Sequence, residues 1–210
     1  MIGYYNRSVI ATYIGLAIAV AGISMAMAGR VQAALLCLMV CGLCDMIDGP
    51  IARRCARCED EKSFGIQIDS LCDLVCFGAL PATICLAVDG VRWYAIAASA
   101  FFVLAAVIRL GYFNVQEINR VRSDPGRRKS YDGLPVTSAA LLVPAFAAAD
   151  TLASVSFAHF YAAPLLVIGV LFISPFRIPK LHARGMILCG LVGAAIFAVM
   201  IAWGGRLETT

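Results

Sequence analysis

Apolar stretches of about 20 residues, the length that a helix needs to cross a bilayer, recur along the whole chain with short polar segments between them. Hydrophobic residues make up 61% of the 210 positions and charged residues only 14%. This pattern predicts an all-α, polytopic transmembrane helical bundle of six to seven spans, formed by a single integral membrane domain over residues 1–210. The expected spans are 9–29, 31–52, 65–88, 92–113, 134–153, 158–176 and 185–204.

The distribution of Lys and Arg predicts the orientation of this bundle, because basic residues in short loops stay on the cytoplasmic side. With a cytoplasmic N-terminus, thirteen of the seventeen basic residues fall in cytoplasmic segments, three fall on the opposite side, and Arg109 lies inside a span. We therefore expect a protein of the cell (inner) membrane. The net charge of +4 suits an anionic lipid surface and does not indicate nucleic-acid binding.

Four aspartates interrupt the apolar pattern near the predicted cytoplasmic face. Asp45 and Asp48 are three residues apart at the end of one span, and Asp69 and Asp73 are four residues apart at the start of the next. At about 100° per residue, each pair shares one face of its helix. Acidic side chains within membrane spans are costly and usually functional, so we expect the two pairs to converge on one site.

Four convergent carboxylates would repel one another unless cations neutralise them. Oxygen ligands favour Mg²⁺ or Mn²⁺, and a cluster this acidic has room for two ions, as in many phosphoryl-type displacements. Gly49 allows close approach to the backbone, and Arg53 offers a fork that matches phosphate, which together suggest a pyrophosphate substrate. Alternatively, residues 48–50 merely end a helix and Arg53 is an anchor, but that interpretation leaves the other acids without a role.

The order of these residues is Asp-x₂-Asp-Gly-x₂-Ala-Arg followed by Gly-x₃-Asp-x₃-Asp, which resembles the signature of the CDP-alcohol phosphotransferases. All eight fixed residues are present, namely Asp45, Asp48, Gly49, Ala52, Arg53, Gly65, Asp69 and Asp73. One feature differs, since eleven residues separate Arg53 from Gly65 where the usual signature has eight. We interpret residues 54–64 as a cytoplasmic linker whose extra length leaves the spacing of each pair unchanged.

The resemblance implies roles for the matched residues. It makes Asp45, Asp48 and Asp69 ligands of divalent metal, Mg²⁺ or Mn²⁺ and two ions in number, and Asp73 both a neighbour of the metal and the general base that activates an alcohol. It also implies that the nucleotide of a CDP-linked lipid binds at Gly49, Ala52, Arg53 and Gly65. Thr12, in the first span, is a further candidate for this nucleotide site, although a lone Thr in a helix more often bonds its own backbone.

Three further stretches resemble the phosphatidylserine synthase branch of the same family: residues 69–81, 109–114 and 133–137. That branch transfers a phosphatidyl group from CDP-diacylglycerol to L-serine and releases CMP. The resemblance suggests Arg109, Asn114 and Pro135 as acceptor-binding residues. Alternatively, Arg109 snorkels to the interface, and residues 133–135 only begin the fifth span.

Other interpretations keep part of this chemistry. Glycerol 3-phosphate or inositol phosphate would be an alternative acceptor, and a divalent cation transporter is a more distant alternative because membrane carboxylates often line transport paths.

The spacing Cys41-x₂-Cys44-x₁₀-Cys55-x₂-Cys58 has the outline of a zinc site, but Cys in apolar spans usually packs as a small hydrophobe. The resemblance also implies a homodimer in the lipid bilayer.

Overall fold

The computed structural model describes residues 9–54, 58–123, 130–153, 160–175, 177–179 and 183–203. Nearly all of these residues are helical, as the apolar pattern predicts. The helices are α1 (Ile10–Met27), α2 (Val31–Arg54), α3 (Glu59–Asp73), the π-helix η2 (Leu74–Ala79), α4 (Leu80–Asp89), α5 (Trp93–Ser123), the short 3₁₀-helix η3 (Val136–Ser138), α6 (Ala139–Ala153), α7 (Ala162–Ile173) and α8 (Ala183–Trp203).

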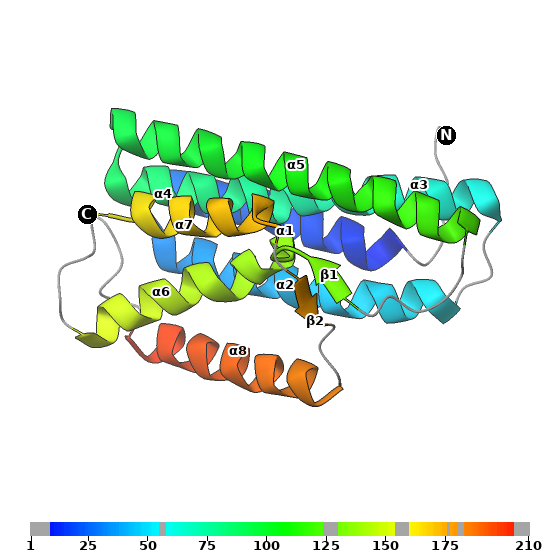
Figure 1. Ribbon diagram of the computed structural model, residues 1–210. Coiled ribbons are helices and arrows are strands. Elements are labelled where there is room, and N and C mark those ends of the chain that lie inside the picture. The colour runs from blue at the N-terminus through cyan, green and yellow to red at the C-terminus, as the bar shows by residue number, and fades with distance from the viewer. Residues whose placement is uncertain are drawn as a thin grey trace.

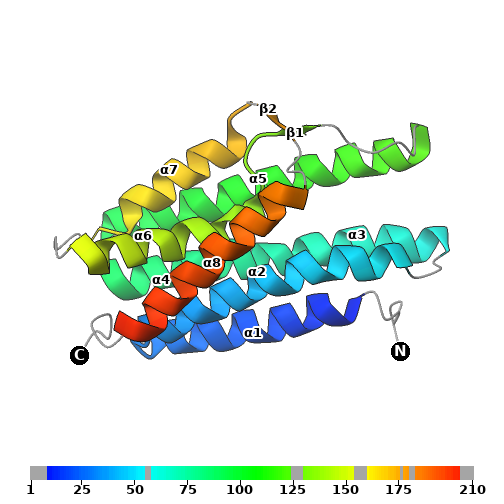
Figure 2. The same cartoon turned by 90° about the horizontal axis from the view of Figure 1, so that it is seen from below.

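The helices form an elongated bundle (Figures 1 and 2). Helices α3, η2 and α4 follow one another without a break and act as a single span. At one end of the bundle, α3 and the C-terminal parts of α2 and α5 project beyond α6, α7 and α8 in both views. Within the described residues, four helical stretches are long and apolar enough to cross a bilayer: 10–27, 31–49, 60–89 and 93–119. The apolar parts of the other three are shorter, at 136–149, 162–173 and 190–202.

One expectation about the connections is wrong. The linker expected at residues 54–64 is shorter than that range, because α2 continues to Arg54 and α3 already begins at Glu59. The N-terminus of α3 is closed by a capping box, in which the backbone N–H of Cys58 donates to Glu61 Oε2 at 2.9 Å. The all-α class is confirmed, with one short addition: β1 (Ser130–Asp132) pairs antiparallel with β2 (Arg177–Pro179) and joins the segments before α6 and after α7.

Small residues hold α1 against α2, its most extensive partner. The buried positions of α1 are Thr12, Gly15, Ala19, Gly22 and Ala26, which recur at the three- and four-residue spacing of one helix face. At Gly22 an added Cβ would lie 2.8 Å from Cys37 Cβ, so only glycine permits this approach. Close packing through small residues is the usual way that helices associate in lipid.

A buried carboxylate that sequence reasoning missed joins α4 to α7. Asp89 is only 3% exposed, and its two oxygens accept the backbone N–H groups of Tyr161 and Ala162, each at 2.8 Å. These N–H groups belong to the first turn of α7, where a helix has no partners of its own for them. Asp89 therefore caps a helix more than seventy residues away in sequence.

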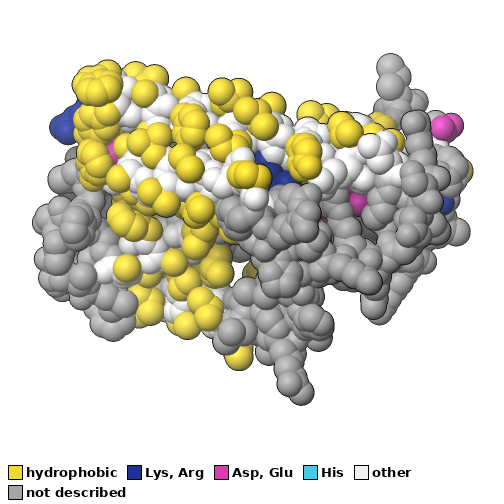
Figure 3. Space-filling model, viewed as in Figure 1, with side chains coloured by type: hydrophobic (Ala, Val, Ile, Leu, Met, Phe, Trp, Pro, Cys, Tyr) yellow, Lys and Arg dark blue, Asp and Glu magenta, His cyan; other side chains and the backbone are white. Residues whose placement is uncertain are grey.

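Large hydrophobic side chains cover the outside of the bundle, as the described part of one face shows over α5 and α7 (Figure 3). Leu104, Ile108, Val167 and Val170 are each half or more exposed. In water an apolar surface of this extent would drive association, whereas in a bilayer it faces lipid tails. The surface and the four long apolar helices together describe an integral membrane protein.

Candidate active site

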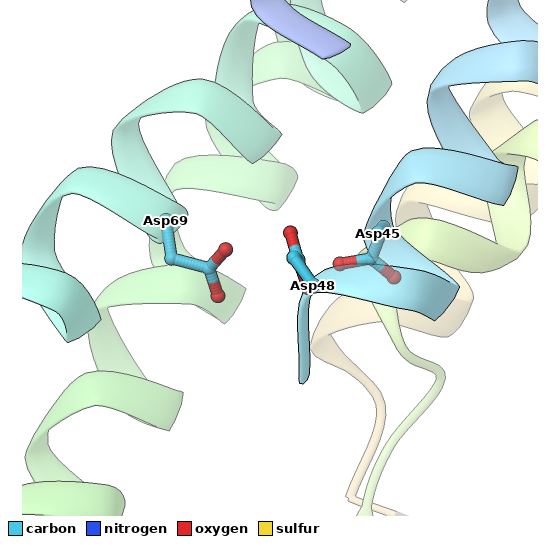
Figure 4. Close-up of side chains that lie close together, drawn as sticks. All are labelled: Asp45, Asp48 and Asp69. Atoms are coloured by element: carbon cyan, nitrogen blue, oxygen red, sulfur yellow. The ribbon is translucent and has the colours of Figure 1, made fainter. Parts of the chain in front are cut away.

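Three of the four predicted acids meet between α2 and α3. Asp45 and Asp48 lie one turn apart on α2, and Asp69 faces them from α3, with the three carboxylates directed toward one another (Figure 4). One oxygen from each carboxylate lies within 4.8 Å of the other two. Asp48 is buried at 8% exposure, and Asp45 and Asp69 are half-buried. The predicted convergence of the two pairs is thus observed for these three side chains.

Asp73 does not belong to the three-oxygen group but shares a cavity with two of its members. The cavity lies between α1, α2, α3 and η2 and is lined by Thr12, Gly15, Cys41, Cys44, Asp45, Asp48, Cys72, Asp73, Cys76 and Phe77. None of these lining residues is basic. Three acids therefore form one close group that could hold a cation, and Asp73 lies one helical turn after Asp69.

Four cysteines form much of the wall of this cavity. Cys41 and Cys44 come from α2, Cys72 from α3 and Cys76 from η2. The Cys41 thiol donates to the backbone oxygen of Gly15 at 3.3 Å, which ties α2 to α1. The other two cysteines of the four-cysteine zinc pattern are not in this wall: Cys58 is exposed at the start of α3, and Cys55 lies outside the described residues.

Thr12 lies beside the acids, where sequence reasoning left two interpretations open. Its hydroxyl donates to Asp48 Oδ2 at 3.2 Å, and both residues are 8% exposed. The bond joins α1 to α2 across thirty-six positions of sequence. The Thr12 hydroxyl thus bonds Asp48 and not its own backbone, which was the alternative interpretation, and its place in the nucleotide site stays a prediction.

The other predicted nucleotide-binding residues lie on the same two helices as the acids. Gly49 directly follows Asp48 and is half-buried, and Gly65 lies one turn before Asp69 on α3. Ala52 and Arg53 belong to the last turn of α2, but their side chains lie outside the described part of the structure. Their role toward a nucleotide remains a prediction.

Arg109 is buried, at 6% exposure, and does not snorkel. Its Nε donates to the backbone oxygen of Leu134 at 3.0 Å and its guanidinium donates to that of Gly133 at 3.3 Å. Gly133 has φ +76°, and a Cβ there would lie 3.0 Å from the backbone oxygen of Ser174, so glycine is required at this turn. Arg109 thus secures the segment that leads into α6.

The remaining acceptor candidates also have structural partners. Asn114 Oδ1 accepts the hydroxyl of Ser70 at 2.7 Å, which links α5 to α3 directly beside Asp69. Pro135 precedes η3, and its backbone oxygen accepts the Ser138 hydroxyl at 2.6 Å. Residues 133–135 therefore begin the fifth helical segment, as one interpretation expected. Acceptor binding by Arg109, Asn114 and Pro135 stays a prediction.

The helix changes its geometry immediately after Asp73. Residues 74–79 form a π-helix, with the Leu80 N–H donating to the backbone oxygen of Val75, five residues earlier. The π segment carries Cys76 and Phe77, which line the cavity. π-helical turns are rare and are frequently found at functional sites. The sequence pattern did not predict this one.

Fold and site together define a membrane-embedded helical bundle with a buried acidic centre built from two consecutive spans. Residues 6–175 match the family model described as CDP-alcohol phosphatidyltransferase. Because the match covers most of the chain, this protein belongs to the CDP-alcohol phosphatidyltransferase family, as the sequence signature predicted. Helix α8 lies beyond the matched range.

Curated relatives carry related names. The chain is 31% identical over 159 residues to the archaetidylserine synthase of Methanothermobacter thermautotrophicus, covering 75% of this chain and 62% of the relative. It is 36% identical over 104 residues to the CDP-diacylglycerol–serine O-phosphatidyltransferase of Saccharomyces cerevisiae, covering 49% and 37% respectively. The enzyme of that name from Helicobacter pylori strain 26695 is 33% identical over 141 residues, covering 65% and 56%. In each case the chain spans less than two thirds of the relative.

Proposed function

We propose that this protein transfers a phosphatidyl group from CDP-diacylglycerol to L-serine, forming phosphatidylserine and releasing CMP. The observation that carries the proposal is the meeting of Asp45, Asp48 and Asp69, with Asp73 in the adjoining cavity. Family membership supports the CDP-linked donor, and the names of the three relatives support serine as the acceptor.

The donor set fits hard divalent metal. Three carboxylate oxygens within 4.8 Å of one another, with no basic residue among the described residues that line the cavity, form an anionic centre that calls for cations with oxygen ligands. Asp45, Asp48 and Asp69 would hold Mg²⁺ or Mn²⁺, two ions in our proposal, with Asp73 nearby. When bound, the ions supply positive charge that stabilises the diphosphate and the departing CMP.

In our proposal, the protein's own side chains orient the two substrates and accept one proton. The serine hydroxyl oxygen attacks the phosphorus that bears the diacylglycerol group, and the bond from that phosphorus to the bridging oxygen breaks. CMP leaves with the electron pair of that bond, and Asp73 takes the hydroxyl proton. Gly49, Ala52, Arg53 and Gly65 would hold the cytidine nucleotide, while the acyl chains stay in lipid.

The same proposal covers the setting of the site. The acids lie near the end of the bundle where α2, α3 and α5 project, and the basic residues of the sequence favour the cytoplasm on that side of an inner membrane. Serine, which is water-soluble, would then enter from the cytoplasm. We further propose a homodimer in which residues 1–210 of each chain form one membrane domain and bind no nucleic acid.

The test is CMP release by purified protein in detergent, supplied with CDP-diacylglycerol and Mg²⁺ or Mn²⁺. Serine, glycerol 3-phosphate and inositol phosphate are compared as acceptors. Asp73→Asn removes the proposed base, and Asp60→Asn makes the same change at an exposed acid of α3 away from the cluster. We expect release that depends on serine and metal, that Asp73→Asn abolishes and that Asp60→Asn leaves intact.

Two outcomes would contradict the proposal. Release with a phosphorylated alcohol but not with serine would keep the family chemistry and refute the acceptor. Metal flux through proteoliposomes without CMP release from any acceptor would instead favour a cation transporter.

A further inference from the structure

We propose that Thr12 is a positioning residue for the metal centre, holding the Asp48 carboxylate in its ligating orientation from a different helix. This inference rests on the proposed metal-binding role of the acids. The Thr12 hydroxyl donates to Asp48 Oδ2 at 3.2 Å, and both side chains are buried. Carboxylates that bind metals are commonly oriented by hydrogen bonds from residues that do not touch the metal.

Hydroxyl residues in the described helices donate either within their own helix or across to another helix, as Ser70 does to Asn114 and Ser99 does to the backbone oxygen of Ala82. Within helices, Ser and Thr usually donate back to the carbonyl four residues earlier. Ser24 does so to Val20 at 3.0 Å and Thr83 does so to Ala79 at 2.9 Å. Thr12 instead donates across the helix interface to an acid of the candidate site. Its hydroxyl is therefore directed to the site by the packing of α1 on α2.

That packing is fixed close to Thr12. At Gly15, one turn further along α1, an added Cβ would lie 3.4 Å from Cys44 Cβ, and the backbone oxygen of Gly15 accepts the Cys41 thiol at 3.3 Å. Cys44 directly precedes Asp45, so the close approach of α1 occurs beside the acids. The backbone that carries Thr12 is thus anchored to the helix that carries Asp45 and Asp48.

The hydrogen bond restricts rotation of the Asp48 carboxylate and keeps it aligned with Asp45 and Asp69. The acceptor is a carboxylate, and the bond lies between two buried side chains, where little water competes for it. Loss of such a supporting group typically lowers metal affinity or activity by about 10- to 100-fold. We expect Thr12→Val, which keeps the side-chain shape and loses the donor, to weaken metal binding within this range.

The experiment measures Mn²⁺ binding to purified full-length protein in detergent by electron paramagnetic resonance, with no CDP-lipid and no serine present. Thr12→Ser keeps the donor and should bind Mn²⁺ within about threefold of the unaltered protein. Thr83→Val removes a hydroxyl that is bonded within its own helix and should leave the Mn²⁺ affinity unchanged. Size-exclusion profiles and thermal unfolding of each variant establish that it is folded.

The inference is supported if Thr12→Val raises the Kd for Mn²⁺ about 10- to 100-fold while Thr12→Ser and Thr83→Val do not. It is overturned if folded Thr12→Val binds Mn²⁺ as tightly as the unaltered protein, which would leave the proposed reaction untouched. Failure of the unaltered protein to bind Mn²⁺ would refute the metal site and the inference together. A wrong acceptor alcohol would not change this readout, because no acceptor is present.

Discussion

The buried carboxylate at the end of α4 allows a quantitative test of how this bundle is held together. Replacing Asp89 with Ala removes the acceptor of two backbone N–H groups, those of Tyr161 and Ala162, in the first turn of α7. Both of these residues are at most 2% exposed, so water cannot readily replace the carboxylate. The change therefore leaves two buried donors without the partner that the folded state provides.

The expected cost follows from these two bonds. A buried donor that loses its acceptor costs about 1–3 kcal/mol, so the pair predicts a loss of about 4 kcal/mol in the free energy of unfolding. For a chain of this size, 1 kcal/mol corresponds to about 2–4 °C, which predicts a fall in apparent Tm of about 8–16 °C. Asp89→Asn keeps one accepting oxygen and should lose roughly half as much.

The assay is size-exclusion chromatography of the detergent-solubilised protein after heating to a series of temperatures. Asp60→Ala, which truncates an exposed acid, is the matched control and should change stability by less than about 0.5 kcal/mol. If Asp89→Ala lowers the apparent Tm no more than Asp60→Ala does, the carboxylate does not cap α7 in the way described.

Two further predictions concern packing and the buried arginine. Gly22→Ala should destabilise the protein by about 1–3 kcal/mol, because the new Cβ would lie 2.8 Å from Cys37 Cβ. Gly111→Ala is the control, since Gly111 has open space around it, and it should raise stability by up to about 1 kcal/mol. Equal shifts in Tm for the two variants would contradict the tight α1–α2 contact. Arg109→Met should lower the apparent Tm, at about 1–3 kcal/mol for each buried carbonyl that loses its donor. An increased KM for serine with an unchanged Tm would instead assign Arg109 to the acceptor site.

The spacing of the acids was predictable because it depends only on the period of a helix. Residues three or four apart share a face, so each of the pairs Asp45–Asp48 and Asp69–Asp73 could be placed before any tertiary structure was known. The convergence of the pairs was also predictable, since both fall near the same ends of two consecutive spans. Spacing alone does not say which three of the four form the tight group, because that depends on how far the facing helices are rotated; only the family resemblance pointed to Asp45, Asp48 and Asp69.

Helix ends were predicted less well than helix positions. The span expected at 65–88 begins at Glu59, and the span expected at 92–113 continues to Ser123. Hydropathy reports where a helix meets lipid, whereas a helix can continue into water wherever capping and polar residues support it. For the same reason, α2 extends to Arg54 and α3 begins at Glu59, inside the range expected for the linker.

The sequence by itself determined the class of fold, the membrane-spanning character, the signature of the family and the residues of the acidic centre, because each of these depends on local composition or short, fixed spacing. Only the tertiary structure decided that Thr12 donates to Asp48, that Asp89 caps α7, and that Arg109 holds the segment before α6. The physical reason is that these contacts join distant parts of the chain. Their partners are chosen by the packing of whole helices, which no short stretch of sequence specifies.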